Sequence, residues 1–149
     1  MSERSKGLRA LERWRGFDED RASVARQLAV QVAASAAAAT RSGEQQALAI
    51  GAERLALLQR PVLDLARLHA SAAFEQAAWT EVGECEQRQQ QADSDADAAR
   101  LRQETAHRMT RAVAQRRERV QRLERDAEEK RLFDAMADLR RASHGGAHD

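Results

Sequence analysis

The sequence predicts an all-α protein, a long antiparallel two-helix coiled-coil hairpin, and three observations carry that prediction. The 149 residues include one proline, no tyrosine and only 3% aromatic side chains. Apolar residues in the last third of the chain alternate three and four positions apart inside a highly charged stretch, which is the spacing of a narrow helical stripe. Turn-forming residues near the middle of the chain offer a place for it to reverse. Because a thin stripe needs a second helix to cover it, we expect a ribbon-shaped core between two helices.

The first arm of the hairpin is expected at about residues 8–58. The helix is predicted to begin after Gly7, with an ionic outer face and one apolar face. That apolar face comprises Leu8, Leu11, Trp14, Ala25, Leu28 and Val32. Residues 33–39 are nearly all alanine, which has high helix propensity but little volume, so two helices can approach closely there. Ser42-Gly43 is the first interruption of the pattern.

The chain is expected to reverse within residues 41–61, toward the end of that range. Pro61 disfavours helical geometry in Arg60 and removes a backbone donor, so either a helix starts with Pro61 in its first turn or a long helix kinks there. The apolar residues around this point keep a heptad spacing. One row is Leu48, Leu55, Val62 and His69, and the other is Leu58, Leu65, Ala72 and Trp79.

The second arm is expected at about residues 61–142. Its polar stretch, residues 84–99, indicates a solvated helix that extends past the end of its partner, or a fray point where Ser94 or Asp95 caps a renewed helix. The apolar seam that follows is predicted at Ala106, Met109, Val113, Arg116, Val120, Leu123 and Ala127.

A second apolar patch follows that seam and is displaced around the helix. It consists of Leu132, Phe133, Met136 and Leu139. This patch is exposed if the first arm stops short of it, which makes it a candidate interaction surface. The alternatives are a contact within a dimer and wrapping by the N-terminal helix. Residues 143–149, with two glycines, are expected to form a flexible tail.

The chain carries no standard motif for binding phosphate, holding a metal or activating a nucleophile. We therefore predict no enzyme activity and no catalytic, cofactor-binding or metal-binding residues. Cys85 is interpreted as a small, semi-buried helix residue, and the lone cysteine fits a reducing, intracellular setting. No run approaches the roughly 20 apolar residues needed to span a bilayer, so we expect a soluble protein with no direct membrane insertion.

The formal net charge of +1 does not demand an acidic partner. The second arm is dense in arginine between residues 108 and 125, but acidic residues are interleaved three or four positions away and can pair with those arginines. No aromatic residues are interleaved for stacking on bases. The pattern favours a solvated face over a nucleic-acid interface.

Both ends of the chain resemble the FliJ/YscO family, the small coiled-coil stalk proteins of flagellar and injectisome type III secretion systems. The similarity lies in Leu8-Arg9-Ala10-Leu11 at the N-terminal end. At the C-terminal end it lies in Glu128-Glu129-Lys130-Arg131-Leu132-Phe133-Asp134-Ala135-Met136-Ala137. The Arg- and Ala-rich, aromatic-poor chain is more similar to injectisome members of plant pathogens than to flagellar members.

The resemblance implies a cytoplasmic hairpin at the inner face of the membrane-bound secretion apparatus, similar to the central shaft of rotary ATPases. Its paired termini would insert into the pore of a hexameric export ATPase, and another part would reach the export gate protein. Some family members also handle export chaperones. Carried onto this chain, the ATPase-binding residues would be Leu8, Leu11, Arg131, Leu132, Phe133 and Met136. The export-gate-binding residues would be Leu65, Phe74 and Trp79, although the aromatic residues expected near the hairpin apex are largely replaced by leucine and alanine.

Two other functions remain open on the sequence. The same seams can serve a self-associating structural coiled coil or export chaperone, in which Arg116 would set register or orientation at some cost in stability. The arginine-rich second arm can alternatively belong to a basic helical nucleic-acid-binding protein, whose affinity would fall steeply with salt.

Overall fold

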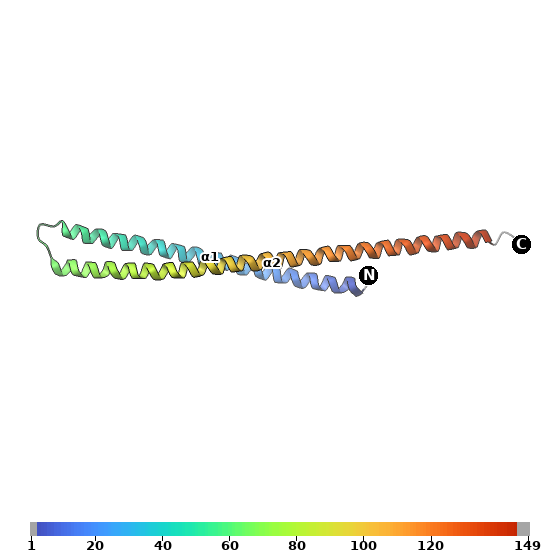
Figure 1. Cartoon of the computed structure of the whole chain (residues 1–149), viewed down its shortest axis with the longest axis horizontal. Coiled ribbons are helices and arrows are strands. Elements are labelled where there is room, and N and C mark those ends of the chain that lie inside the picture. The colour runs from blue at the N-terminus through green and yellow to red at the C-terminus, as the bar shows by residue number, and fades with distance from the viewer. Residues whose placement is uncertain (1–2, 146–149) are drawn as a thin grey trace. The chain divides into compact units, whose positions relative to one another are not determined.

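The computed structural model describes residues 3–145, which form two helices joined by a short connection (Figure 1). Helix α1 is Glu3–Leu58 and helix α2 is Leu65–Gly145. The chain divides into two compact units. Unit 2 is residues 22–103, and unit 1 combines the residues up to 21 with those from 104 onward. The all-α, two-helix hairpin predicted from the sequence is confirmed.

Several predicted boundaries are wrong by a few residues. Helix α1 begins at Glu3 and not after Gly7, and it runs through Ser42-Gly43 without interruption. One glycine in a helix costs only about 1 kcal/mol relative to alanine, which a long flanking helix tolerates. Helix α2 continues to Gly145, so residues 143–145 are helical where a flexible tail was expected. Residues 146–149 of that predicted tail lie outside the described residues.

The reversal occupies residues 59–64, at the end of the predicted range and slightly beyond it. Helix α1 closes with short-range bonds from Gln59 N to the Ala56 carbonyl (3.3 Å) and from Arg60 N to the Leu57 carbonyl (3.4 Å). Helix α2 starts after Pro61 and not at it, because Asp64 caps it. The Asp64 Oδ1 accepts a hydrogen bond from the backbone N–H of Arg67 at 3.1 Å, as an N-cap residue does.

In unit 2 the two helices lie side by side and meet along a seam of small residues (Figure 1). Its buried and half-buried positions recur every seven residues, the repeat of a coiled coil. On α2 they include Ser71, Ala78, Cys85, Ala92 and Ala99, and on α1 they include Ala29, Ala33, Ala36, Thr40, Gly43 and Ala47.

Two glycines of α1 show how closely the helices approach in unit 2. A Cβ atom built on Gly43 would lie 3.3 Å from Cγ2 of Val82, and one built on Gly51 would lie 2.9 Å from Oε1 of Glu75. Both distances are tighter than ordinary van der Waals contact. The small seam residues therefore allow a close approach that larger side chains would prevent.

The predicted heptad rows near the reversal are on the wrong face of the helices. Leu48, Leu55, Leu58, Leu65 and Trp79 are exposed, together with Val62, His69 and Ala72. The close approach explains the error, because small residues occupy most of the seam and leave these larger ones outside. Residues 84–99 do not extend past their partner, since Cys85, Ala92 and Ala99 are buried in the seam. The helix is also continuous there, with no cap at Ser94 or Asp95.

In unit 1 the seam is more polar. Its buried and half-buried residues include Ser5, Leu8, Glu12, Arg15 and Glu19 on α1, and Ala106, Thr110, Val113, Arg117 and Val120 on α2. The prediction was correct for Ala106, Val113 and Val120. It was wrong for Met109, Arg116, Leu123 and Ala127, which are exposed. Met109, Arg116 and Leu123 lie beside the seam, and Ala127 lies beyond its end.

In unit 1, helix α2 extends beyond the N-terminal end of α1. Glu12 pairs with Arg117 across antiparallel helices, so Glu3, nine residues before Glu12, lies opposite a position near Asp126. No described residue of α1 lies opposite residues 127–145, which we call the overhang. At 1.5 Å per residue the overhang is about 28 Å long. Every side chain described from Arg125 to Ser143 is exposed.

Candidate interaction surfaces

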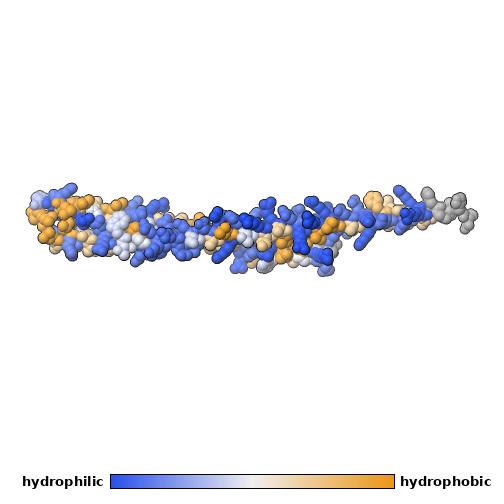
Figure 2. Space-filling model, viewed as in Figure 1, coloured by the Kyte–Doolittle hydropathy of each residue, from blue (hydrophilic) through white to orange (hydrophobic). Residues whose placement is uncertain are grey.

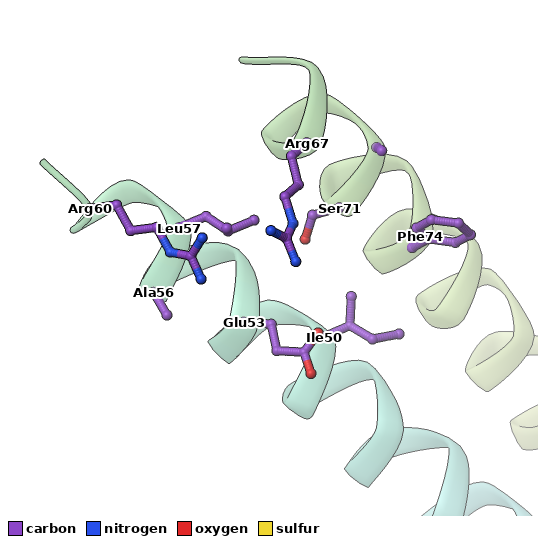
Figure 3. Close-up of a pocket in the computed structure, with 9 residues that line it drawn as sticks. Ile50, Glu53, Ala56, Leu57, Arg60, Arg67, Ser71 and Phe74 are labelled. Carbon is purple, nitrogen blue, oxygen red and sulfur yellow. The ribbon is translucent and has the colours of Figure 1, made fainter. Parts of the chain in front are cut away.

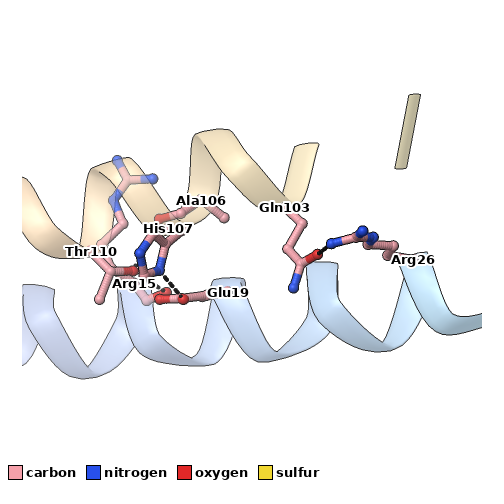
Figure 4. Close-up of polar contacts among 7 residues, drawn as sticks. All are labelled: Arg15, Glu19, Arg26, Gln103, Ala106, His107 and Thr110. Carbon is pink, nitrogen blue, oxygen red and sulfur yellow. Dashed lines mark hydrogen bonds and ion pairs between the residues drawn. The ribbon is translucent and has the colours of Figure 1, made fainter. Parts of the chain in front are cut away.

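Ionic and hydroxyl side chains fix the register of the two helices in unit 1 (Figure 4). The Glu19 Oε1 lies 2.6 Å from Nδ1 of His107, and Glu12 pairs with Arg117. The Thr110 hydroxyl, a single donor, lies within hydrogen-bonding distance of the backbone carbonyls of Ala106 (3.0 Å) and Arg15 (3.3 Å). Hydrogen bonds from His107 and then Thr110 lower the pKa of Glu19 below its ordinary value of 4.5. These contacts hold one antiparallel alignment and expose the overhang beyond it.

The first candidate surface is an apolar cluster on the overhang, made of Leu132, Phe133, Met136 and Leu139. All four are exposed, Phe133 to 67%. Their spacing of three and four residues places them on one side of α2. Arg131 is also exposed, but its position around the helix lies outside this cluster. Among the described residues of unit 1 this face has no partner, and it is available to another protein.

The structure does not bring the two groups of predicted ATPase-binding residues together. Leu8 is half-buried in the seam of unit 1, and Leu11 is exposed on the paired part of α1. From the pairing of Glu12 with Arg117, Leu8 lies opposite a position near Gln121. Leu132 follows eleven residues later, about 16 Å further along α2. The C-terminal cluster therefore stands apart from Leu8 and Leu11.

The second candidate surface is the end of unit 2 where the helices join, which we call the tip. Apolar side chains gather there, as Figure 2 shows. The exposed large apolar residues of the tip are Leu55, Leu58, Val62, Leu63 and Leu65. Val62 is the most exposed, at 82%. Such a concentration on one end of a unit is typical of an interaction surface.

The three predicted gate-binding residues are all exposed but do not form one patch. Leu65 lines a groove on one side of the tip together with Arg54, Leu58 and His69. Phe74 lines a groove on the other side. Trp79 lies fourteen residues after Leu65, about 21 Å along α2. The tip thus offers two separate surfaces that the sequence did not distinguish.

The groove beside Phe74, which we call the tip groove, has a volume of about 510 Å³ (Figure 3). It is lined by Ile50, Glu53, Ala56, Leu57, Arg60, Arg67, Ala70, Ser71 and Phe74. The guanidinium group of Arg67 points into the space between the helices, and that of Arg60 lies over the end of α1. Within the described residues neither makes an ion pair, in contrast to Arg54, whose Nε lies 2.5 Å from Oε2 of Glu75 on the other side of the tip.

The sequence analysis missed Arg60 and Arg67. A signal was present, because Asp64 is the only acidic residue between them in the sequence, and a carboxylate at the start of a helix is expected to bind the helix backbone. Asp64 has that role here, because its carboxylate accepts the backbone N–H of Arg67 and caps α2.

Within residues 3–145 no group of three or more histidine, cysteine, aspartate or glutamate side chains is arranged to hold a metal ion. Neither of the two described helices contains a stretch apolar and long enough to cross a membrane. Cys85 is buried in the seam of unit 2 and forms no disulfide. Searches of protein-family models, curated proteins and solved structures found no match to this chain.

Proposed function

We propose that this protein is a non-enzymatic stalk of a type III secretion system, of the FliJ/YscO kind, acting in the cytoplasm at the inner face of the secretion apparatus. The observation that carries the proposal is the overhang. It presents an exposed apolar cluster on a single helix that no described residue of α1 covers. A lone helix is thin enough to enter the pore of a hexameric ring, with a diameter of about 10–12 Å including side chains.

In this proposal the overhang enters the export ATPase first. Leu132, Phe133 and Met136 make apolar contacts with the ring, and Arg131 supplies a charge to acidic groups of the pore. Leu8 and Leu11 follow on the paired part of unit 1 and touch the ring only where the hairpin is two helices thick. The polar seam supports this arrangement, because the Glu12–Arg117 and Glu19–His107 contacts hold α2 in one register against α1.

The stalk would contribute no catalytic group. A ring of six similar subunits can be biased when a shaft contacts its subunits unequally, because the shaft then stabilises some ring conformations over others. The expected effect is stimulation or organisation of ATP hydrolysis. The tip, with Leu65 and Phe74, and Trp79 further along α2, would contact the export gate protein, and export chaperones are further partners of this proposal.

The test measures ATP hydrolysis by the export ATPase of the same secretion system, with and without the full-length protein. Replacing Phe133→Asp and Met136→Asp together should abolish stimulation, because two carboxylates cannot be desolvated in an apolar contact without a partner. The matched control is Ala127→Asp with Arg141→Ala, which changes the net charge by the same two units on the opposite side of the overhang. The control should keep stimulation, and circular dichroism should show equal helicity in both variants.

Two results would contradict the proposal. One is full stimulation by the Phe133→Asp, Met136→Asp variant, and the other is equal loss in the control. Failure of the wild-type protein to capture the ATPase in a pull-down would remove the stalk assignment altogether.

A self-associating coiled coil is the second candidate, and one observation favours it. Val24, Leu28 and Val32 are large apolar residues of α1 in unit 2, and each is at least half exposed. A second copy could cover them, as in a helical bundle. Sedimentation velocity separates the candidates, because the stalk is expected to be an elongated monomer and the rival a tight dimer at all accessible concentrations.

A further inference from the structure

The tip groove combines an apolar floor with an unbalanced charge. Ile50 and Leu57 come from α1, and Phe74 comes from α2, where 68% of its side chain is exposed. All three side chains line the groove, and Figure 3 shows Arg67 reaching into the space between the two helices. An aromatic ring left this exposed beside two aliphatic residues offers area that a partner can bury.

The charge of the groove is carried by Arg60 and Arg67. Glu53 is the single acidic residue that lines it, and none of these three makes an ion pair within the described part of the chain. The groove on the other side of the tip differs, because its Arg54 is already paired with Glu75 at 2.5 Å. Positive charge is thus left unbalanced on one side of the tip only.

The geometry also limits the shape of an occupant. From Ile50 to Leu57 the α1 wall covers two helical turns, about 10 Å. A third helix laid along two helices over that length would place anchors at i, i+4 and i+7 against Ile50, Leu57 and Phe74. Two guanidinium groups at one end of the groove can each bind a carboxylate in bidentate geometry.

We propose that the tip groove binds an acidic amphipathic helix of a protein partner, with bulky apolar residues on one face and at least two carboxylates beside them. The inference deepens the proposed function and rests on it only for the expectation that the tip meets a protein. Phe74, Ile50 and Leu57 receive the apolar face. Arg60 and Arg67 receive the carboxylates and select against basic helices.

The experiment selects, from a phage-displayed library of helical peptides, those that bind the immobilised full-length protein. The expected result is enrichment of peptides that combine leucine, phenylalanine or methionine at helical spacing with aspartate or glutamate. The best synthetic peptide is then titrated by fluorescence anisotropy. Exchange of both arginines, Arg60→Glu with Arg67→Glu, should weaken binding at least about tenfold, because two charge-assisted contacts are lost and replaced by repulsion.

The matched control is Arg41→Glu with Arg102→Glu. Both arginines lie in unit 2, are exposed, make no described ion pair and do not line the tip groove. The control should change affinity by less than about twofold, as expected for screened charges at a distance. Selection repeated on the Arg60→Glu, Arg67→Glu variant should enrich basic peptides instead. Circular dichroism checks that all variants keep their helicity.

The proposal is overturned if no peptides are enriched, if the enriched peptides lack acidic residues, or if both double variants weaken binding equally. It is also overturned if the tip binds phosphatidylcholine–phosphatidylglycerol vesicles in preference to every selected peptide, since the occupant would then be a lipid surface. No ATPase is present in this experiment. If the ATPase test fails but peptide binding is retained, the stalk proposal is wrong and the groove proposal stands. If the ATPase test succeeds but no acidic peptide binds, the groove proposal is wrong and the stalk proposal stands.

Discussion

Replacing Ala47 with leucine should destabilise unit 2, although leucine is a residue that coiled-coil cores commonly use. Ala47 is fully buried, with 0% of its surface exposed. It lies one helical turn from Gly43, where an added Cβ would already come within 3.3 Å of Val82. The site therefore has no space for a larger side chain unless the two helices move apart.

The magnitude follows from the three carbon atoms that leucine adds. Extra methylene groups in a filled core cost about 1–3 kcal/mol through strained side chains and displaced backbone. If the seam instead held unfilled space, each added carbon would contribute about 0.8 kcal/mol of stabilisation. The two cases differ in sign. For a chain of this size, the expected cost corresponds to a Tm lowered by about 2–12 °C.

Thermal unfolding followed by circular dichroism measures this change in the full-length protein. The control is Ala52→Leu, on the exposed side of the same helix, where we expect the free energy of unfolding to change by no more than about 0.5 kcal/mol. A higher Tm for Ala47→Leu would refute the close approach of the helices. An equal drop for both substitutions would point to helix propensity and not to packing.

Two further predictions concern unit 1. Because hydrogen bonds from His107 and Thr110 lower the pKa of folded Glu19, its carboxylate contributes stability above its ordinary pKa of 4.5, and this contribution is lost as the pH falls through the lowered value. Glu19→Gln should therefore be less stable than the wild type at neutral pH, and the difference in Tm should shrink in acid; a difference that grows below pH 4.5 would contradict the assignment. Leu123→Ala should change the free energy of unfolding by less than about 0.5 kcal/mol, since 62% of Leu123 is exposed, whereas Val120→Ala in the seam should cost more. Chemical denaturation of both variants measures the two free energies of unfolding. A larger decrease for Leu123→Ala than for Val120→Ala would place Leu123 in the seam, as the sequence predicted.

Much of the fold could be predicted from local properties of the chain. Helix-forming composition, the turn around Pro61 and the alternation of apolar residues are sufficient for two long helices and one reversal. The exact ends were harder to predict because they depend on single contacts. The cap from Asp64 to Arg67 moves the start of α2 to Leu65, and nothing in the residues around Gly7 stops α1 from starting at Glu3.

The candidate surfaces could be predicted only in part. The displacement of the patch that holds Phe133 and Met136 left exposure, a dimer contact and wrapping by the N-terminal helix all open, and in the structure both side chains are exposed. The separation of Leu8 from Leu132 was not expected, because it depends on the register that Glu12 and Arg117 fix between distant parts of the chain. The unpaired state of Arg60 and Arg67 likewise depends on which carboxylates the fold brings near them.

By itself the sequence determined that this chain forms long helices and reverses once, because propensity, capping and turn chemistry act over a few residues. Only the tertiary structure decided which face of each helix is buried. Each helix carries both a stripe of large apolar residues and a stripe of small ones, and periodicity favours the large. Two helices that approach closely bury the small stripe, with Ala47, Ala92 and Ala99 inside and Leu48, Leu55 and Leu65 outside. That choice belongs to the pair of helices and cannot be read from either one alone.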